Sequence, residues 1–298
     1  MARKHILHML TPLRHMSPFD VNMAVDAGYD VVVPYEEVGL AEITGLVQDA
    51  IFSRPPDAGI NTGIFIAGKD AALALDMFAA ARKAMLPPFK VSVFADPAGS
   101  FTTAAAMVAK TEKLLRSKFE RTLDGTRIAV FGATGVVGYC TAVIAAKEGA
   151  QVTLVGYDGV ERVTKIAADI KRRFDVDVSP ADGSTDDKKK AAVHASQVVL
   201  SAAKAGIQVL SRDQLSQAQD LLIAADVNAV PPAGIEGLAM NANGDPIEAT
   251  RAVGIGPLAI GNVKYKTEFG LFQKMIGAEK PVALDFQDAF ALAREIAK

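Results

Sequence analysis

The stretch from Arg127 to Asp158 limits the possible folds of this chain more than any other part of it. It reads as a short apolar strand, a glycine-rich turn, an alanine-rich helix and a second apolar strand. Within it, Gly132, Gly135 and Gly138 follow one another at intervals of three residues. In such a unit the first glycine permits a tight turn, the second lets a pyrophosphate approach the backbone, and the third lets the helix pack closely on the strand. The complete pattern predicts a dinucleotide-binding turn, and a turn that binds nothing is the alternative.

The residues expected to contact the dinucleotide lie where predicted parallel strands end, because ligands of open α/β sheets bind at the carboxyl ends of the strands. Strands are expected at 128–131, 152–155, 198–200 and 221–225. Small residues after the third strand would let a nicotinamide ribose come close to the backbone, and polar residues after the fourth would lie on the nicotinamide side. The assigned cofactor-binding residues are Gly132, Ala133, Thr134, Gly135, Val136, Val137, Gly138, Tyr157, Asp158, Ser201, Ala202, Asp226 and Asn228.

The choice between NAD and NADP depends on the tip of the second strand, where Tyr157 and Asp158 follow a glycine. Asp158 would accept hydrogen bonds from ribose hydroxyls and repel a 2′-phosphate, although it suits a turn before Gly159 equally well. Tyr157 would lie against the adenine. No arginine occupies the tip, and Arg162 follows a few residues later. We therefore expect NAD as the cofactor, with NADP also accepted.

The composition excludes several classes of protein and site. Acidic and basic residues are interspersed and nearly balance, at a net charge of −2, so nothing indicates binding to nucleic acid or to a membrane surface. The apolar runs are too short to span a bilayer, and the first residues lack the apolar core of a signal peptide, so we expect a cytoplasmic protein. A single cysteine, Cys140, excludes an intramolecular disulfide, and four scattered histidines form no metal site.

The length of 298 residues predicts two domains. Strands and helices alternate before residue 100, which is typical of a parallel sheet with helices on its faces. Two long helices, one from the turn at 100–103 to about 119–121 and one from 257 to about 276, are expected to join the domains. We predict an α/β fold with a Rossmann-type dinucleotide-binding domain at 122–257 and an α/β catalytic domain at 1–121 and 258–298. Smaller expectations are a helix cap at Ser100, a short strand at Val176–Val178, and a strand at Arg251–Ile255 that closes the second sheet.

The usual motifs of a general base or a nucleophile are missing from the sequence. No GxSxG segment occurs, and no tyrosine is followed four residues later by a lysine. A nucleotide site without an obvious general base favours a hydride transfer in which the substrate itself stabilises the cation that it becomes.

Six segments, together covering essentially the full length, carry a resemblance to a known family. The six segments are MLTPLRHMSPFDVNMAVDAGYD (9–30), TGIFIAGKD (62–70), FADPAGSFTTAAAMVA (94–109), FGATGVVG (131–138), ADVNAVPPAGI (225–235) and VGIGPLAIGNVKYK (253–266). With these segments the chain resembles the NAD(P)-dependent methylene-tetrahydromethanopterin dehydrogenases of methylotrophic bacteria, in particular the form that accepts NAD. The related methylene-tetrahydrofolate dehydrogenases share a Gly-x-Gly-Pro motif that matches Gly254–Pro257.

The resemblance implies oxidation of 5,10-methylene-tetrahydromethanopterin to its methenyl form, with hydride transfer to NAD(P)⁺, in the one-carbon oxidation of formaldehyde. It also implies a homotrimer. The strictly NADP-dependent relatives carry arginine at the position of Tyr157, so its replacement here supports the use of NAD. The folate enzymes use a Tyr-x-x-x-Lys motif for cyclohydrolase activity, and this sequence lacks that motif. The resemblance therefore implies a dehydrogenase without cyclohydrolase activity.

The catalytic residues are expected in and beside the two long helices, in a cleft between the domains. Thr102 and Thr103 place hydroxyls in the first turn of one helix, at the end of a strand. Lys264 lies about two turns into the other and would hydrogen-bond a pterin carbonyl or pair with a carboxylate such as Asp20. We assign all four residues to the catalytic site. The alternatives are hydroxyls that only cap the helix, and a solvent-exposed Lys264, with Lys266 equally eligible.

Two other functions remain open. One is a methylene-tetrahydrofolate dehydrogenase that uses the same cleft. The other is a redox sensor that binds NAD(P) and regulates a partner without turnover. The hydroxyl-rich turn at 100–103 and Lys264 argue against a sensor, because a sensor needs no second pocket facing the nicotinamide.

Overall fold

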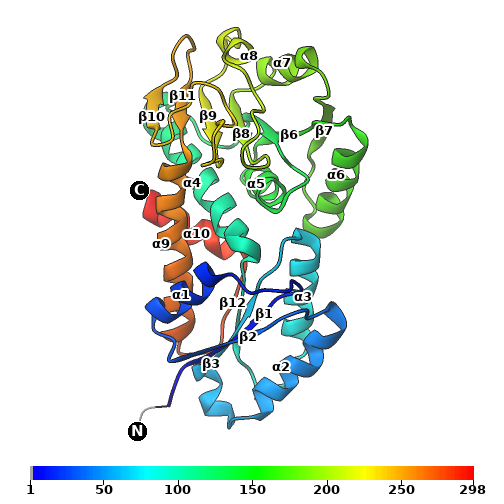
Figure 1. The fold of residues 1–298 in the computed structure, drawn as a ribbon, viewed down its shortest axis with the longest axis vertical. Helices are drawn as coiled ribbons and strands as arrows, with labels where there is room; N and C mark the ends of the chain where they lie inside the picture. The colour runs from blue at the N-terminus through cyan, green and yellow to red at the C-terminus, as the bar shows by residue number, and fades with distance from the viewer. Residues whose placement is uncertain (1–2) are drawn as a thin grey trace. The chain divides into compact units, whose positions relative to one another are not determined.

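The computed structural model of the protein describes residues 3–298, which form two compact units. Unit 1 comprises the chain up to Thr102 together with Tyr265–Leu292, and unit 2 comprises Thr103–Lys264 together with Ala293–Lys298. The boundaries fall inside three helices (Figure 1), which are α4 (Ser100–Phe119), α9 (Pro257–Ile276) and α10 (Phe286–Ala297). Both units combine a largely parallel sheet with helices, which confirms the predicted α/β class and the two long helices.

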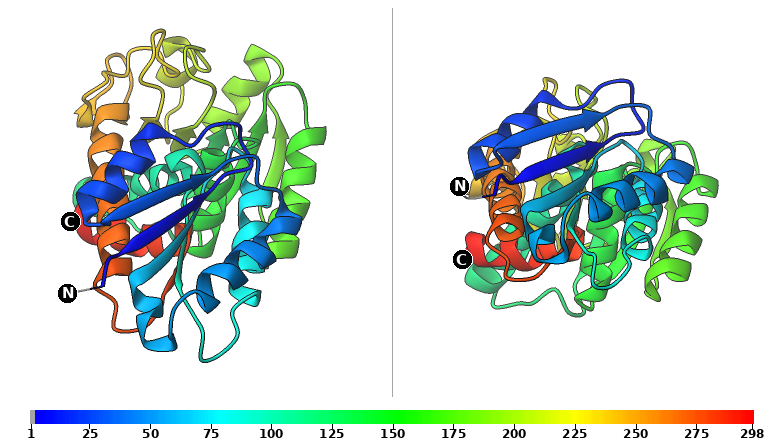
Figure 2. Two further views of the ribbon diagram at one scale, coloured as in Figure 1. Left: turned by 60° about the horizontal axis from the view of Figure 1, so that its bottom comes forward. Right: turned by 90° about the horizontal axis from the view of Figure 1, so that it is seen from below.

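Unit 1 is built on a five-stranded parallel sheet in the order β12-β4-β3-β1-β2. Helices α2 and α3 lie on one side of this sheet, and α1 lies with the C-terminal part of α9 on the other (Figure 2). Short 3₁₀ segments occupy Leu40–Glu42, Pro56–Asn61 and Pro97–Gly99. The other elements are β1 (Ile6–Leu10), α1 (Pro18–Ala27), β2 (Val31–Tyr35), α2 (Ile43–Phe52), β3 (Thr62–Ile66), α3 (Ala71–Lys83), β4 (Ser92–Ala95) and β12 (Ala283–Leu284).

An aromatic cluster fills the core of unit 1 between the sheet and α9. The rings of Phe65, Phe94 and Phe272 are fully buried, and their centroids lie 5.3–5.4 Å apart. Tyr29 meets Phe272 edge-on. The strand β3 passes close to these groups, since a Cβ on Gly63 would lie only 2.6 Å from the Tyr29 hydroxyl. A side chain at position 63 would therefore force the Tyr29 hydroxyl and the ends of Leu7 and Met275 to move.

Unit 2 is built on a seven-stranded sheet in the order β10-β11-β9-β8-β5-β6-β7. The chain runs outward from β5 through β6 to β7, and then outward in the opposite direction from β8 through β9 to β11. Its direction therefore switches between β5 and β8, as in doubly wound sheets. The elements are β5 (Arg127–Phe131), α5 (Val136–Lys147), β6 (Gln151–Gly156), α6 (Glu161–Phe174), β7 (Ser179–Asp182), α7 (Asp186–His194), β8 (Val198–Ser201), α8 (Arg212–Ser216), β9 (Ile223–Asp226), β10 (Asn243–Pro246) and β11 (Val253–Ile255).

Three of the smaller expectations are wrong. Residues 176–178 are not a strand, and the strand beside β6 begins instead at Ser179. The edge of the sheet is closed by β10, which pairs antiparallel with β11, and not by the strand at 253–255 itself. The start of α4 is capped by Asp96, whose Oδ1 accepts hydrogen bonds from the backbone N–H groups of Phe101 (2.8 Å) and Thr102 (3.2 Å), and not by Ser100.

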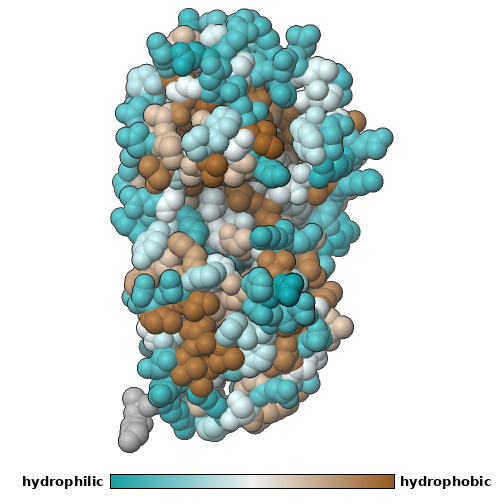
Figure 3. Space-filling model, in the orientation of Figure 1, coloured by the Kyte–Doolittle hydropathy of each residue, from teal (hydrophilic) through white to brown (hydrophobic). Residues whose placement is uncertain are grey.

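Apolar residues gather on the surface of unit 1 that is visible in Figure 3, in the region of α1 and β2. Phe19 and Val25 on α1 have 46% and 51% of their surface exposed, and Val31–Val33 on the edge strand β2 are half-buried. We call these residues the α1/β2 patch. Within residues 3–298, no helix is long and apolar enough to cross a membrane. The same residues contain no cluster of three or more His, Cys, Asp or Glu side chains arranged to hold a metal ion.

Candidate functional site

A pocket of about 770 Å³ opens in unit 2 where the chain direction switches between β5 and β8. Its walls include Phe131 and Gly132 at the end of β5, and Val155 and Tyr157 at the end of β6. Ala202 and Ala203, directly after β8, complete this part of the lining. Doubly wound sheets bind ligands at this position, outside the carboxyl ends of the strands on either side of the switch.

The glycine-rich turn forms one wall of the pocket, and its three glycines have different roles. Gly132 has a φ of 79°, and a Cβ on it would lie 2.5 Å from the carbonyl carbon and oxygen of Ala202. Gly138 is buried, and a Cβ there would lie 2.7 Å from the carbonyl carbon of Gly132. Gly135 caps α5 at the pocket wall, and a Cβ there would meet only the Gly132 oxygen, at 3.5 Å. Gly132 and Gly138 are thus required by the fold, whereas Gly135 leaves space in the pocket.

The rest of the predicted turn is divided between pocket and core. Thr134 lines the pocket, whereas Ala133 is buried. Val136 and Val137 begin α5, so their backbone N–H groups belong to the first helical turn, where the helix itself supplies no acceptor. A negatively charged group placed over Gly135 would be stabilised by these N–H groups and by the helix dipole.

The tip of β6 carries an aromatic ring, an acid and a guanidinium in contact with one another. Tyr157 and Arg162 both line the pocket, and the guanidinium carbon of Arg162 lies 5.6 Å from the centre of the Tyr157 ring. Arg162 Nη1 donates hydrogen bonds to the Tyr157 hydroxyl (3.1 Å) and to Oδ2 of Asp158 (2.9 Å). The negative charge of Asp158 is therefore balanced by Arg162, which weakens its expected repulsion of a 2′-phosphate.

Beyond β8 and β9, the assigned polar residues hold a loop in place. The buried carboxylate of Asp226 accepts from the backbone N–H groups of Asn228 (3.1 Å) and Gly234 (2.8 Å). Burial raises the pKa of Asp226 above its ordinary value, although these hydrogen bonds favour its charged form. Asn228 accepts from Gly206 and Val230 through Oδ1 and donates to the Pro232 carbonyl through Nδ2. Both side chains act within the protein, so any effect on a ligand is through the shape of the loop.

Ser201 is the last residue of β8 and Ala202 follows it, and of the two only Ala202 lines the pocket. Ser201 is fully buried, at the register position opposite Asp226. Ala202 and Ala203 line the pocket, as expected for small residues that let a ligand approach the backbone. The following loop adds lining residues that the sequence did not single out, which are Lys204, Ile207, Gln208 and Val209.

Two further lining residues, Ser184 and Lys189, come from the segment after β7. They were missed because the strand was expected at 176–178, which misplaces the end of β7 and the turn that follows it. The available signal was Thr185, a good N-cap residue whose side chain accepts from the Lys188 N–H at the start of α7. Recognition of a strand that ends at Asp182, a short turn and a helix capped by Thr185 would have predicted that this segment lies beside the pocket.

The four residues assigned to catalysis differ in burial. Asp20 is buried in the first turn of α1, and Lys264 is half-buried on α9 while Lys266 is exposed. Thr102 is fully buried, and its hydroxyl donates to Asp96 Oδ2 (2.6 Å), so it stabilises the capping carboxylate. Thr103 is half-buried. Among the two threonines, Thr103 is the better candidate for a contact with substrate.

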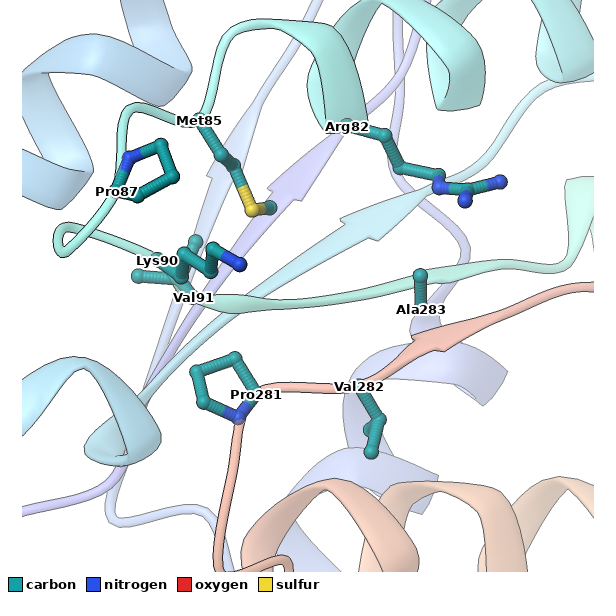
Figure 4. A pocket seen from close by; sticks show the side chains of 8 residues that line it. All are labelled: Arg82, Met85, Pro87, Lys90, Val91, Pro281, Val282 and Ala283. Carbon is teal, nitrogen blue, oxygen red and sulfur yellow. The ribbon is translucent and has the colours of Figure 1, made fainter.

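A smaller cavity of about 290 Å³ lies in unit 1 between the α3–β4 loop and the segment that leads into β12. Figure 4 shows Met85 and Lys90 on one side of it and Pro281 and Val282 on the other. It is too small for a dinucleotide, and it lies away from a switch in strand order. The pocket in unit 2 fits a dinucleotide because it has the volume, the open space over Gly135 and the helix N-terminus that a pyrophosphate requires.

Comparison with known proteins agrees with this geometry. Residues 18–98 match the family model described as methylene-tetrahydromethanopterin dehydrogenase, N-terminal. The NAD(P)-dependent methylenetetrahydromethanopterin dehydrogenase of Methylorubrum extorquens is 56% identical over 297 residues, which is 100% of both chains. The bifunctional protein MdtA of the same organism is 32% identical over 281 residues, covering 94% of this chain and 95% of the relative.

Among solved structures, shikimate 5-dehydrogenase from Listeria monocytogenes in complex with shikimate and NAD has the same type of fold. Its TM-score is 0.50 at 15% identity, and the match covers 99% of this chain and 96% of that one. At such low identity the likeness concerns the fold alone. The full-length identity to the Methylorubrum extorquens enzyme is far more specific. The chain therefore belongs to the family of NAD(P)-dependent methylenetetrahydromethanopterin dehydrogenases.

Proposed function

We propose that this protein oxidises 5,10-methylene-tetrahydromethanopterin to the methenyl form by direct hydride transfer to NAD(P)⁺. The observation that carries this proposal is the pocket at the β5–β8 switch, with its glycine-rich turn and the N-terminus of α5, in a chain that is 56% identical to an enzyme named for this activity. We place the reaction in the one-carbon oxidation of formaldehyde by a methylotroph.

The chemistry of the substrate explains why no general base is needed. The carbon bridging two pterin nitrogens loses a hydride and becomes an amidinium-like cation, whose charge both nitrogens share. No proton has to leave the reacting carbon. NAD(P)⁺ held at the Gly132–Gly138 turn would supply the hydride acceptor. The protein then has to hold the two reacting carbons about 3–3.5 Å apart and aligned, and positioning of this kind accounts for a large part of many rate enhancements.

We propose separate tasks for the two parts of the chain. Residues 122–257 form the NAD(P)-binding domain, in which Gly132–Gly138 hold the pyrophosphate and Tyr157 lies against the adenine. Residues 1–121 and 258–298 form the catalytic domain, in which Asp20, Thr103 and Lys264 contact the pterin. Thr102 supports this group indirectly, by holding Asp96 at the start of α4.

A spectrophotometric assay tests the function. Purified protein is mixed with methylene-tetrahydromethanopterin or methylene-tetrahydrofolate, each with NAD⁺ and with NADP⁺, and formation of the reduced nucleotide is followed. We expect turnover with both nucleotides and a kcat/KM at least about tenfold higher for the methanopterin, because each pterin presents different groups to the site. A preference for the folate would instead identify a methylene-tetrahydrofolate dehydrogenase. Nucleotide binding without turnover of either pterin would identify a sensor.

We further propose that the protein is a cytoplasmic homotrimer in which the α1/β2 patch contacts another copy. An exposed apolar patch beside an unpaired edge strand is typical of a surface that is covered in an assembly. Light scattering after size-exclusion chromatography should give three times the monomer mass of 31.3 kDa. Val25→Glu should lower this mass because it places a charge in the contact. A monomeric parent protein would contradict the proposal.

A further inference from the structure

We propose that Lys189, Ser184 and Arg162 form a subsite for the 2′-phosphate of NADP at the adenosine end of the pocket. This inference rests on the nucleotide site proposed above. It concerns how a chain without arginine at the tip of β6 accommodates a 2′-phosphate there. All three side chains line the same pocket, although they come from α6, the β7–α7 turn and α7.

The β7–α7 turn lies directly against the tip of β6. The backbone N–H of Gly183 donates to the Gly156 carbonyl (2.8 Å), and this bond continues the pairing of β6 with β7. A Cβ on Gly183 would overlap the Val155 side chain and would lie 3.7 Å from Cγ of Lys189. The stem of Lys189 therefore stands beside the last residues of β6, where the adenosine ribose binds in folds of this type.

The charges at this end of the pocket favour an anion. Asp158 follows β6 by two residues, and its ion pair with Arg162 offsets its charge. Lys189 has an ion pair with Asp186 at 3.6 Å, but the Asp186 side chain is 88% exposed, so the pair is weak and readily exchanged. Arg162 and Lys189 thus line the pocket, whereas the carboxylates that pair with them, Asp158 and Asp186, do not. A dianionic phosphate would gain charge-assisted hydrogen bonds from Lys189 and Arg162.

The subsite is fixed by contacts behind it. The backbone N–H of Ser184 donates to Asp182 Oδ1 (2.8 Å), and Lys188 Nζ donates to Asp182 Oδ2 (2.6 Å), which together hold the turn. Ser184 therefore lines the pocket from a braced backbone, and its Oγ accepts from Lys188 Nζ at 3.5 Å. Lys188 takes part in this bracing, whereas Lys190 is directed to Asp213 on α8, at 3.7 Å. Of the three consecutive lysines, Lys189 is the one that lines the pocket.

Calorimetric titration of the full-length protein with NADP⁺, NAD⁺ and adenosine 2′,5′-bisphosphate tests the proposal. For Lys189→Ala we expect the Kd for NADP⁺ and for the bisphosphate to rise about tenfold or more, because a charge-assisted hydrogen bond is lost. The Kd for NAD⁺ should stay within about twofold, which also reports that the variant is folded. Lys189→Arg should retain most of the affinity for NADP⁺. Lys190→Ala, which removes the neighbouring half-buried lysine, should leave all three constants within about twofold.

Equal changes for NAD⁺ and NADP⁺ in Lys189→Ala, or no change for either, would overturn the proposed subsite. These outcomes are independent of the catalytic assignment. If the parent protein oxidises the pterin but Lys189→Ala leaves the ratio of the two Kd values unchanged, the subsite is wrong and the function stands. If the ratio shifts but no pterin is oxidised, the subsite stands and the function is wrong.

Discussion

Gly135→Val is expected to weaken NAD⁺ binding by about 100-fold or more while the protein remains folded. The Gly135 backbone has an ordinary extended conformation (φ −89°, ψ 165°), and its Cβ position meets only one atom within 4 Å, the Gly132 oxygen at 3.5 Å. A valine is therefore tolerated by the protein itself. Its methyl groups would fill the space over the N-terminus of α5, which the pyrophosphate needs in order to reach the N–H groups. Calorimetry gives the affinity, and circular dichroism with a thermal melt tests the fold.

Gly138→Val is the matched control, because it is three residues away in the same turn but has the opposite expected effect. A Cβ there would lie 2.7 Å from the Gly132 carbonyl carbon and 2.8 Å from the Ala133 Cα, and both are backbone atoms that cannot move aside cheaply. We expect this variant to lose its cooperative thermal transition or to aggregate. Normal NAD⁺ affinity in a folded Gly135→Val protein would show that the pyrophosphate does not bind at this turn.

The features that the sequence predicted correctly are those decided by neighbouring residues. The turn at Gly132–Gly138 depends on backbone geometry that few other residues permit, so its spacing identifies it. The limits of α1 follow from local signals of the same kind. Ser17 accepts from the Asp20 N–H, Pro18 is the first helical residue, and Gly28 ends the helix with a φ of 117°. Local rules of this kind need no knowledge of the rest of the fold.

The features that were missed depend on residues distant in sequence. Strand β7 reads Ser-Pro-Ala-Asp and has no apolar pattern, since it is an edge strand whose pairing with β6 defines it. The apolar alternation just before it, at 176–178, is not a strand. This segment belongs to the turn after α6, where Lys171 forms ion pairs with both Asp175 and Asp177. Because the end of β7 was misplaced, Ser184 and Lys189 could not be assigned to the pocket.

Polar residues at strand ends show a second limit of reasoning from sequence. Asp226 and Asn228 stand at the carboxyl end of β9, where a ligand contact is the natural expectation. The structure shows that their polar atoms are used by the loop at 228–234 and by Gly206. Asp96 likewise caps α4, a role that the sequence suggested for Ser100. A sequence identifies a polar group near a site, but the backbone conformation decides whether that group meets the ligand or the protein.

Lys264→Ala is expected to lower kcat/KM for the methylene pterin by about 100-fold, or about 2.7 kcal/mol of transition-state stabilisation, with the Kd for NAD⁺ within about twofold. Lys264 is half-buried about two turns into α9, so part of its side chain is shielded from solvent, unlike that of a fully exposed lysine. A cation there would hinder the formation of a methenyl cation if it lay beside the reacting carbon. Its proposed role is therefore to hold the pterin through a carbonyl oxygen, which keeps the reacting carbon aligned with the nicotinamide.

Lys266→Ala provides the control for this role, since Lys266 is exposed on the same helix and has the same charge. We expect its kcat/KM to stay within about twofold of the parent, a difference of roughly 0.4 kcal/mol. Steady-state kinetics with varied pterin at saturating NAD⁺ separates the two variants, and calorimetry checks the nucleotide affinity. If Lys264 positions the pterin, Lys264→Arg should recover part of the activity, because a guanidinium also donates to a carbonyl oxygen. Equal, small losses in Lys264→Ala and Lys266→Ala would mean that neither lysine contacts the substrate.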